Sequence, residues 1–417
     1  MNDTEATAEQ QRRRRTSQLL WLSGSLFVVF GIALVVLQLT SGGSQPTPNP
    51  SGSPTPTPTI NTTQPTLLIR VAEGGAARGN LVTATTSGLD ARASLLSLPD
   101  NVVVASRQVA PRELVRSGGA TVRQLSNALA VTLGVRIDAV WQMDRKALAG
   151  LVDAAGGVVI EVPQRTVVRT VDGKAQERFR PGRQRLSGTS ASWYAVGKVT
   201  DESAAAAAQR FDAVMTAALV SLPRSEPEVR ETLTALGALS PTTVPTELLS
   251  GYLVELGALL AASDTESAAL PVTEIGTGTF TSAWTDYRTA VPLLSDLFPD
   301  ALWQAEVDGD PRVLVMAPAD PPGVILSTRS RLGSEELEWV DGRGVAVEPR
   351  KRSVVQTLPP VIWGQDTAAA LGLPSAAVTE VESEQPGAGL LADVDVTLGR
   401  DYRPGSPTAA PVRSVEP

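Results

Sequence analysis

The sequence predicts an α/β fold that follows one N-terminal transmembrane helix. Four consecutive arginines, Arg12 to Arg15, precede an apolar run from Leu19 to Leu39 that contains no charged residue. A run of this length crosses the hydrocarbon of a bilayer as a helix, and arginines beside one end favour a cytoplasmic N-terminus. After this run, strand-like and helix-like segments alternate between residues 66 and 163, as in a sheet covered by helices. We therefore expect a single-pass protein of the cell membrane with its C-terminal domains outside the cytoplasm.

The segments around the apolar run follow from the same composition. We expect a cytoplasmic tail over residues 1–17, the transmembrane helix over 18–40 and a linker over 41–65 that is rich in Pro, Thr and Ser. Prolines favour an extended chain, so the linker is expected to act as a spacer. The alternative for the apolar run is a cleaved signal peptide. Signal peptides have about 7–15 apolar residues and a small-residue cleavage site, whereas this run is longer and has no clear Ala-x-Ala site.

The composition excludes several kinds of chemistry. The 417 residues include no cysteine and no histidine, and the net charge is −8. Disulfide scaffolds, zinc sites built on His or Cys, and histidine-dependent triads are therefore excluded. A cation bound by oxygen ligands, such as Mg²⁺, stays open. The acidic balance argues against nucleic acid as a partner, because general nucleic-acid binding needs a basic face.

Short apolar runs separated by Gly, Asp and Pro predict the strands of the first domain. We expect strands at residues 66–71, 80–85, 93–99, 101–105, 139–143 and 158–162. An apolar stripe at helical spacing predicts a helix over 118–134, with Thr121 as its N-cap. A second helix is expected to begin at Asp144 and to end at Gly156-Gly157.

The second half of the chain gives a mixed pattern. Residues 180–192 are polar and predict turns, and residues 264–283 predict a loop rich in Thr, Ser and Gly. Between them, the alanine-rich residues 201–220 predict one helix and residues 225–260 predict two more.

The last third of the chain predicts a small α/β domain of its own. Residues 312–316 and 392–398 are expected to form its first and last strands, and residues 324–332 a helix between them.

Three motifs stand out in the first domain. Residues 133–163 contain Leu-Gly-Val-Arg-Ile-Asp and then Leu-Val-Asp-Ala-Ala-Gly-Gly-Val, and residues 182–188 follow the pattern Gly-x-Gln-x-Leu-x-Gly. These motifs resemble the LytR-CpsA-Psr family of bacterial cell-envelope proteins. Residues 392–402 resemble the closing strand of the C-terminal domain that LytR-type proteins often carry. The resemblance implies a LytR-CpsA-Psr-like domain with a helical extension over 66–309, a LytR-type C-terminal domain over 310–404 and a tail over 405–417.

The resemblance also implies an activity. Active family members are phosphotransferases of cell-wall biogenesis that move an anionic glycopolymer from a polyprenyl pyrophosphate carrier to peptidoglycan. Such chemistry needs arginines and a carboxylate-held metal to stabilise charge on the transferred phosphoryl group. It also implies an apolar slot for the lipid between the sheet and the helices.

The positions that match the family's catalytic motifs depart from them. Asn80 stands where the family has an acid, and Asp100 stands where it has an arginine. Lys198 replaces one arginine further along, and alanines such as Ala204 and Ala207 replace others. Because each charge-assisted contact to phosphate is worth about 1.5–3 kcal/mol, these losses favour a pseudoenzyme. We therefore assign no catalytic residue.

The remaining cations are the candidates for phosphate binding: Arg78, Arg107, Lys198 and Arg210. Asp201 is the one candidate metal ligand, with an N-cap of the alanine-rich helix as its alternative role. We expect no cofactor, and Mg²⁺ only if the protein is active.

The leading hypothesis is a non-catalytic envelope protein anchored in the bacterial membrane. It binds a polyprenyl-linked glycopolymer, a wall glycopolymer or an envelope protein. Two alternatives stay open. One is an active glycopolymer–peptidoglycan phosphotransferase with a rearranged cation site, and the other is an extracytoplasmic scaffold for protein interactions.

Overall fold

The computed structural model describes residues 63–88, 90–116, 120–169, 176–277, 280–318, 323–381 and 390–404. The expected cytoplasmic tail, transmembrane helix, most of the linker and the C-terminal tail lie outside these residues. Across the described part, none of the helices combines the length and the apolar character that crossing a membrane requires.

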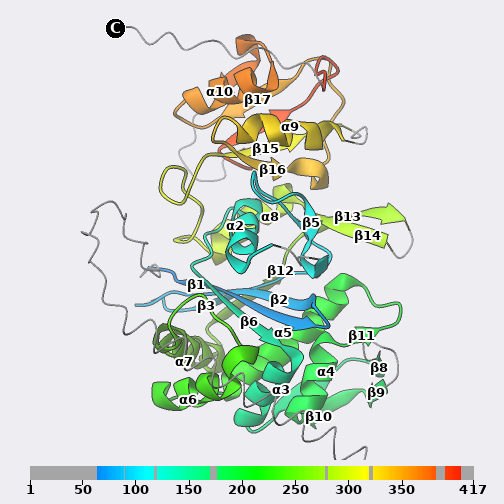
Figure 1. The fold of residues 1–417 in the computed structure, drawn as a ribbon, viewed down its shortest axis with the longest axis vertical. Coiled ribbons are helices and arrows are strands. Elements are labelled where there is room, and N and C mark those ends of the chain that lie inside the picture. Colours follow the sequence, from blue (N-terminus) through cyan, green and yellow to red (C-terminus); the bar gives the residue numbers. More distant parts are fainter. Residues whose placement is uncertain are drawn as a thin grey trace, which may run out of the picture. The chain divides into compact units, whose positions relative to one another are not determined.

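A central five-stranded sheet organises the first half of the described chain (Figure 1). Its strands, in spatial order, are β12 (Thr265–Ala269), β3 (Ala93–Ser97), β2 (Ala76–Thr85), β1 (Thr66–Glu73) and β6 (Ala139–Asp144). The pair β1–β6 and the pair β12–β3 are parallel, and the other pairs are antiparallel. The mixed α/β architecture predicted from the sequence is therefore present.

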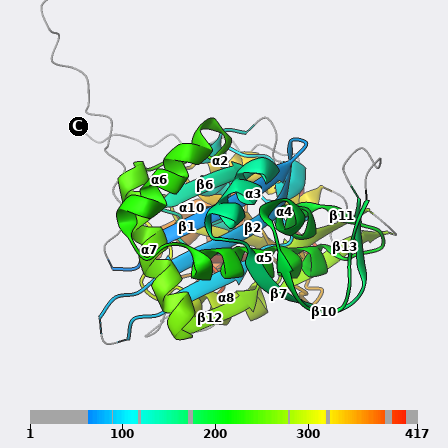
Figure 2. The ribbon, with the colours of Figure 1, turned by 90° about the horizontal axis from the view of Figure 1, so that it is seen from below.

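Helices cover both faces of this sheet. Ile69 and Leu68 are neighbours on β1, and because side chains alternate along a strand they enter different cores. On the Ile69 face lie α3 (Arg145–Ala154), α4 (Gly188–Val196), α5 (Ala204–Ser221), α6 (Glu226–Leu236) and α7 (Thr246–Ala262), several of which are seen over the sheet in Figure 2. On the Leu68 face lie α2 (Val122–Leu133) and α8 (Tyr287–Leu297).

Small sheets extend the first domain at its edges. They pair β4 (Val103–Val104) with β5 (Arg112–Glu113), β7 (Val158–Val162) with β10 (Gly182–Leu186), β8 (Thr166–Arg169) with β9 (Gln176–Phe179) and β11 (Lys198–Val199), and β13 (Val272–Thr277) with β14 (Phe280–Thr285). Single turns of 3₁₀ helix occur at Leu114–Arg116, Gly237–Leu239, Gly342–Gly344 and Ser375–Ala377.

Two predicted helix starts are confirmed at the level of single hydrogen bonds. The Thr121 side chain accepts from the backbone N–H of Gln124, and the Gln124 side chain accepts from that of Thr121, which makes a capping box. Asp144 accepts from the N–H of Ala147 at 2.7 Å and begins α3.

Two segments that the sequence predicts as turns or loops are regular structure. Residues 180–192 form β10 and the start of α4, and residues 264–283 form β12, β13 and much of β14. The first residue of α4 is held from another helix, because Asp153 of α3 accepts from the N–H of Gly188 at 2.6 Å. Such long-range partners carry no local sequence signal.

A second five-stranded sheet occupies the C-terminal part. Its strands, in spatial order, are β16 (Glu338–Asp341), β15 (Arg312–Met316), β19 (Val394–Thr397), β17 (Val354–Thr357) and β18 (Val378–Glu380). One face packs on α9 (Val324–Gly333) and α10 (Ile362–Leu371). The opposite face packs on residues of α2 and α8, so the two halves share a core.

Candidate functional site

Arg78 is the first predicted phosphate-binding cation, and its guanidinium is engaged by an acid. Arg78 lies on β2 and donates from Nη1 to Oδ2 of Asp100, which follows β3, at 3.1 Å. The Asp100 side chain is 14% exposed. Burial raises the pKa of Asp100; the charge of Arg78 opposes this shift, and the negative charges of Glu113 and Glu202 add to it.

Arg210 on α5 is the second such cation, and it is held more completely. Its Nε and Nη2 each donate to an oxygen of Glu202 at 2.6 Å, and Nη2 also donates to the carbonyl of Gly197 at 3.0 Å. The guanidinium carbon lies 5.5 Å from the centre of the Tyr194 ring. Nη1 is buried and has no hydrogen-bond partner within the described part of the chain. Arginine binds phosphate with the same bidentate geometry that it uses for carboxylate. Glu202 therefore occupies the edge of the Arg210 guanidinium that would bind a phosphate.

The two ion pairs lie close enough to interact, since Glu202 acts on the pKa of Asp100. We call Arg78, Asp100, Glu202 and Arg210 the arginine–carboxylate cluster. It contains two positive and two negative groups. Sequence reasoning identified the arginines but missed the acids as their partners, and no local signal links residues so far apart in the chain.

The shifted pKa of Asp100 predicts a pH dependence of stability. Because the folded-state pKa is raised above the unfolded value of about 3.9, the free energy of unfolding falls as pH rises from that value through the folded-state pKa. The free energy of unfolding of the Asp100→Asn variant is expected to fall less over this pH range than that of the native chain. Denaturant titrations of both proteins at acidic and neutral pH measure it, and parallel pH profiles would contradict it.

A buried polar pair lies on β1 and β2, two residues along β2 from Arg78. Arg70 on β1 stands opposite Asn80 on β2 and donates from Nε to Asn80 Oδ1 at 3.2 Å. Burial lowers the pKa of Arg70 to about 10. Asn80 Nδ2 is buried, and no described residue accepts a hydrogen bond from it. Asn80 is therefore part of the interior rather than an exposed ligand.

Arg145 is a cation that sequence reasoning missed. It is the first residue of α3, and its Nε lies 3.1 Å from Oε2 of Glu73. Its guanidinium stacks over the ring of Trp193, 3.8 Å from the ring centre. The sequence offered one signal for Arg145, because this residue directly follows the predicted N-cap Asp144. A residue at the junction between a strand and the next helix lies at one end of the sheet.

Side chains fill the space between the sheet and the helices beside the cluster. The ring of Phe211 lies against Gly79, where any Cβ atom would collide with it. Further along the same face, a crevice of about 10 Å³ is lined by Pro65, Thr66, Leu67, Ala139, Val244, Leu249 and Tyr252. That volume holds about one water molecule, so this crevice is too small for a lipid chain.

Residues 108–286 match the model of the LytR_cpsA_psr family. This stretch is a LytR-CpsA-Psr family domain. The matched range includes Arg145, Glu202 and Arg210, whereas Arg78 and Asp100 precede it. The resemblance found in the motifs at residues 133–163 and 182–188 is thereby confirmed, whereas the motif at 392–402 lies outside the match and stays a prediction.

Several solved structures are similar to the chain. TagV from B. subtilis is 12% identical, with a TM-score of 0.47, over 58% of this chain and 99% of that one. The LytR-Csp2A-Psr enzyme from Actinomyces oris is 19% identical, with a TM-score of 0.44, over 56% and 89%. TagT bound to LI-WTA is 16% identical, with a TM-score of 0.46, over 58% and 91%. No curated protein sequence matches this chain.

Arg107 and Lys198 are the other two predicted cations. Arg107 pairs with Asp310 at 2.6 Å and with Glu338 at 3.3 Å, so it joins the first domain to the C-terminal sheet. Lys198 is exposed on β11, directly opposite Arg169 of β8. The structure thus brings together Arg78 and Arg210 but not Arg107. Lys198 directly follows Gly197, whose carbonyl accepts from Arg210, but the Lys198 side chain is exposed.

Asp201 is poorly placed for either of its predicted roles. It is exposed with a left-handed φ of 61°, and the residue that caps α5 is Ser203, which accepts from the N–H of Ala206. The N-cap prediction for Asp201 was therefore wrong by two residues. Among the described residues, no three acidic side chains gather in a way that holds a metal ion. The acids of the cluster are each bonded to an arginine.

Proposed function

We propose that the chain is a membrane-anchored envelope protein that keeps the LytR-CpsA-Psr fold and binds a wall glycopolymer without transferring it. The observation that carries the non-catalytic part is the arginine–carboxylate cluster. Transfer of a phosphoryl group requires cations whose charge is free to act on phosphate oxygens. Arg78 and Arg210 each have their charge balanced by an acid of the same chain. The family match supports the envelope role, and the apolar run at Leu19–Leu39 supports the anchor.

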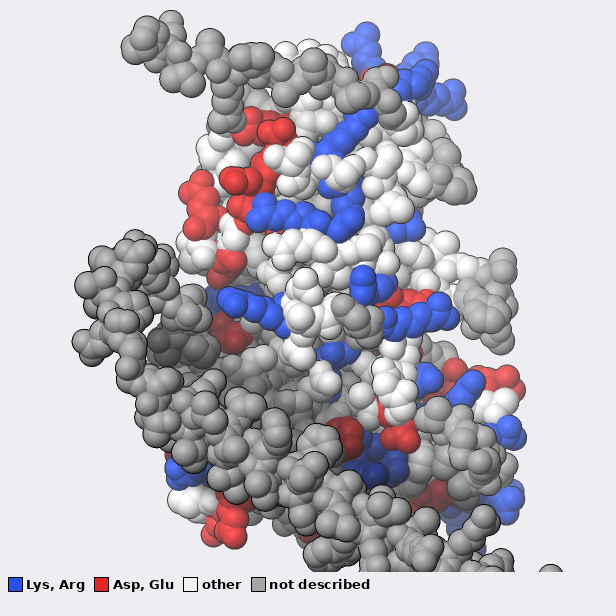
Figure 3. Space-filling view, viewed as in Figure 1, with Lys and Arg blue, Asp and Glu red and all other residues white. Residues whose placement is uncertain are grey.

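The charge distribution on the surface agrees with this proposal. Figure 3 shows acidic and basic side chains interspersed on the described face rather than one large basic field. A ligand with many negative charges therefore gains little from this face as a whole. Recognition of a glycopolymer would rest on local contacts.

One observation favours the active phosphotransferase as the second candidate. Arg210 Nη1 and Asn80 Nδ2 are buried donors that have no hydrogen-bond partner among the described residues. Buried donors are nearly always paired, and a bound phosphate or diphosphate would supply the missing acceptors. The two candidates differ in whether a bound substrate is cleaved.

The deciding experiment is a cleavage assay on the purified full-length chain in detergent. A polyprenyl pyrophosphate-linked glycopolymer is supplied with Mg²⁺, and released polyprenyl phosphate is measured beside an active family enzyme. We expect release no greater than without protein, for the native chain and for Arg78→Ala alike. Release by the native chain that Arg78→Ala abolishes would establish the active phosphotransferase. Retention of the same polymer without release is the result expected for the proposed function.

A further inference from the structure

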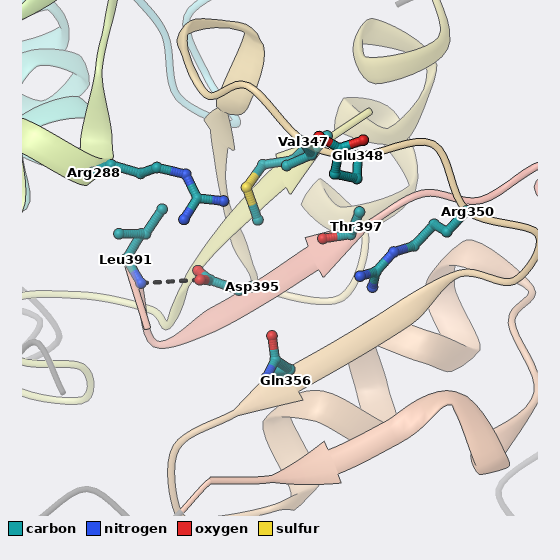
Figure 4. Close-up of a pocket in the computed structure, with 9 residues that line it drawn as sticks. Arg288, Val347, Glu348, Arg350, Gln356, Leu391, Asp395 and Thr397 are labelled. Atoms are coloured by element: carbon teal, nitrogen blue, oxygen red, sulfur yellow. Dashed lines mark hydrogen bonds between the residues drawn. The ribbon is translucent and has the colours of Figure 1, made fainter. Parts of the chain in front are cut away.

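A separate cavity lies on the C-terminal sheet. Its volume is about 260 Å³, and its lining residues are Arg288, Met316, Val347, Glu348, Arg350, Gln356, Leu391, Asp395 and Thr397. Figure 4 shows Arg288 and Arg350 at opposite ends, with Asp395 and Thr397 between them and Gln356 on the neighbouring strand. None of these residues belongs to the arginine–carboxylate cluster.

The sheet register explains the polar floor of this cavity. Gln356 of β17 stands opposite Asp395 of β19, and Met316 of β15 stands opposite Thr397. Because alternate residues of a strand share a face, Asp395 and Thr397 project to the same side. Asp395 is 5% exposed and accepts from the N–H groups of Leu391 and Ala392 at 3.0 and 3.1 Å. The floor is therefore fixed by backbone hydrogen bonds.

The arginines of this cavity differ from those of the cluster. Arg288, near the start of α8, and Arg350, before β17, are exposed. Within the described part of the chain, neither guanidinium makes a hydrogen bond or an ion pair, whereas those of Arg78, Arg107 and Arg210 are each held by an acid. The two groups thus retain donors for a ligand at both ends of one cavity.

The acids of the cavity oppose this positive charge only in part. Burial raises the pKa of Asp395 to about 7, although the N–H groups of Leu391 and Ala392 and the charges of Arg312 and Arg288 lower it. Asp395 therefore carries a partial charge at neutral pH, and Glu348 carries the other negative charge. The two guanidinium groups give the cavity a net positive charge.

We propose that this cavity binds a small phosphorylated, hydroxyl-bearing ligand, such as a single sugar phosphate. Arginine binds phosphate oxygens through its planar fork of donors, and Arg288 and Arg350 supply two such forks. Gln356, Thr397 and Asp395 offer partners for hydroxyl groups, while Met316, Val347 and Leu391 offer apolar surface for ring carbons. Cavities for drug-sized ligands begin at about 300 Å³, so this cavity suits a ligand that contains a single sugar ring. The inference does not depend on the proposed function.

The test is isothermal titration calorimetry of the full-length chain in detergent with glucose 1-phosphate, inorganic phosphate and glucose. We expect saturable binding of glucose 1-phosphate, weaker binding of phosphate and none of glucose. Arg350→Gln is expected to weaken glucose 1-phosphate binding about tenfold, because it removes a charge-assisted contact. Arg288→Gln is expected to act in the same direction.

Two control variants show whether the ligand binds in this cavity. Arg352→Gln removes the same charge from an exposed neighbour that does not line the cavity, and it is expected to leave binding unchanged. Arg78→Ala changes the cluster alone and is also expected to leave binding unchanged. Absence of saturable glucose 1-phosphate binding, or equal weakening by Arg350→Gln and Arg352→Gln, would overturn the proposal.

Discussion

Replacing Glu202 by alanine is expected to lower the free energy of unfolding by about 3–5 kcal/mol. The Glu202 side chain is 14% exposed and that of Arg210 is 8% exposed, and two hydrogen bonds of 2.6 Å join them. Removal of the carboxylate leaves the guanidinium buried without its acid, and Nη1 already lacks a hydrogen-bond partner among the residues that the structure describes. A buried charge without a counter-charge is among the most destabilising changes in proteins. A denaturant titration followed by tryptophan fluorescence measures the loss.

Two further variants show whether burial causes this loss. Glu202→Gln keeps an acceptor for Arg210, so a smaller loss is expected. Glu226→Ala removes an acid of the same type from an exposed pair with Arg230 on α6, where the groups are 3.7 Å apart. Exposed pairs at this helical spacing contribute about 0.3–0.5 kcal/mol. If Glu202→Ala lowered the free energy of unfolding as little as Glu226→Ala does, the expectation that burial makes the Arg210–Glu202 pair important for stability would be contradicted.

The parts of the fold that the sequence predicts well depend on local chemistry. The caps at Thr121 and Asp144 bond to groups three residues away, so the residues that form them are visible together in the sequence. The strand at 66–71 and the helix at 324–332 likewise carry their own hydrophobic pattern. The local hydrophobic pattern was therefore sufficient to predict the α/β fold class.

The parts that the sequence predicts poorly depend on distant partners. The strand β12 is polar and largely exposed, and it becomes a strand because it pairs with β3, which lies far away in the sequence. The start of α4 depends on Asp153, and the state of Arg78 depends on Asp100. The sequence shows which cations are present, but it does not show which acid balances each one.

Because the acids of the arginine–carboxylate cluster balance the charge of its arginines, neutralising these acids is expected to strengthen the binding of a diphosphate. The double variant Asp100→Asn with Glu202→Gln is expected to bind inorganic pyrophosphate at least about tenfold more tightly than the native chain. Both replacements keep the shape of the side chain and an oxygen acceptor, so Arg78 and Arg210 keep their positions. They lose the negative charges that compete with a diphosphate for the same donors. Each recovered charge-assisted hydrogen bond contributes about 1.5–3 kcal/mol.

A matched double variant separates this local effect from a change in net charge. Asp310→Asn with Glu338→Gln neutralises the two acids that pair with Arg107, which lies at the contact with the C-terminal sheet. It removes the same number of negative charges, but it frees one guanidinium rather than two neighbouring ones. Calorimetry with pyrophosphate is expected to show the gain for the cluster variant alone. An equal gain in both would mean that overall charge controls the affinity, and no gain in either would mean that the arginines of the cluster do not face a diphosphate. In that case the acids of the cluster would not support the proposed absence of phosphoryl transfer.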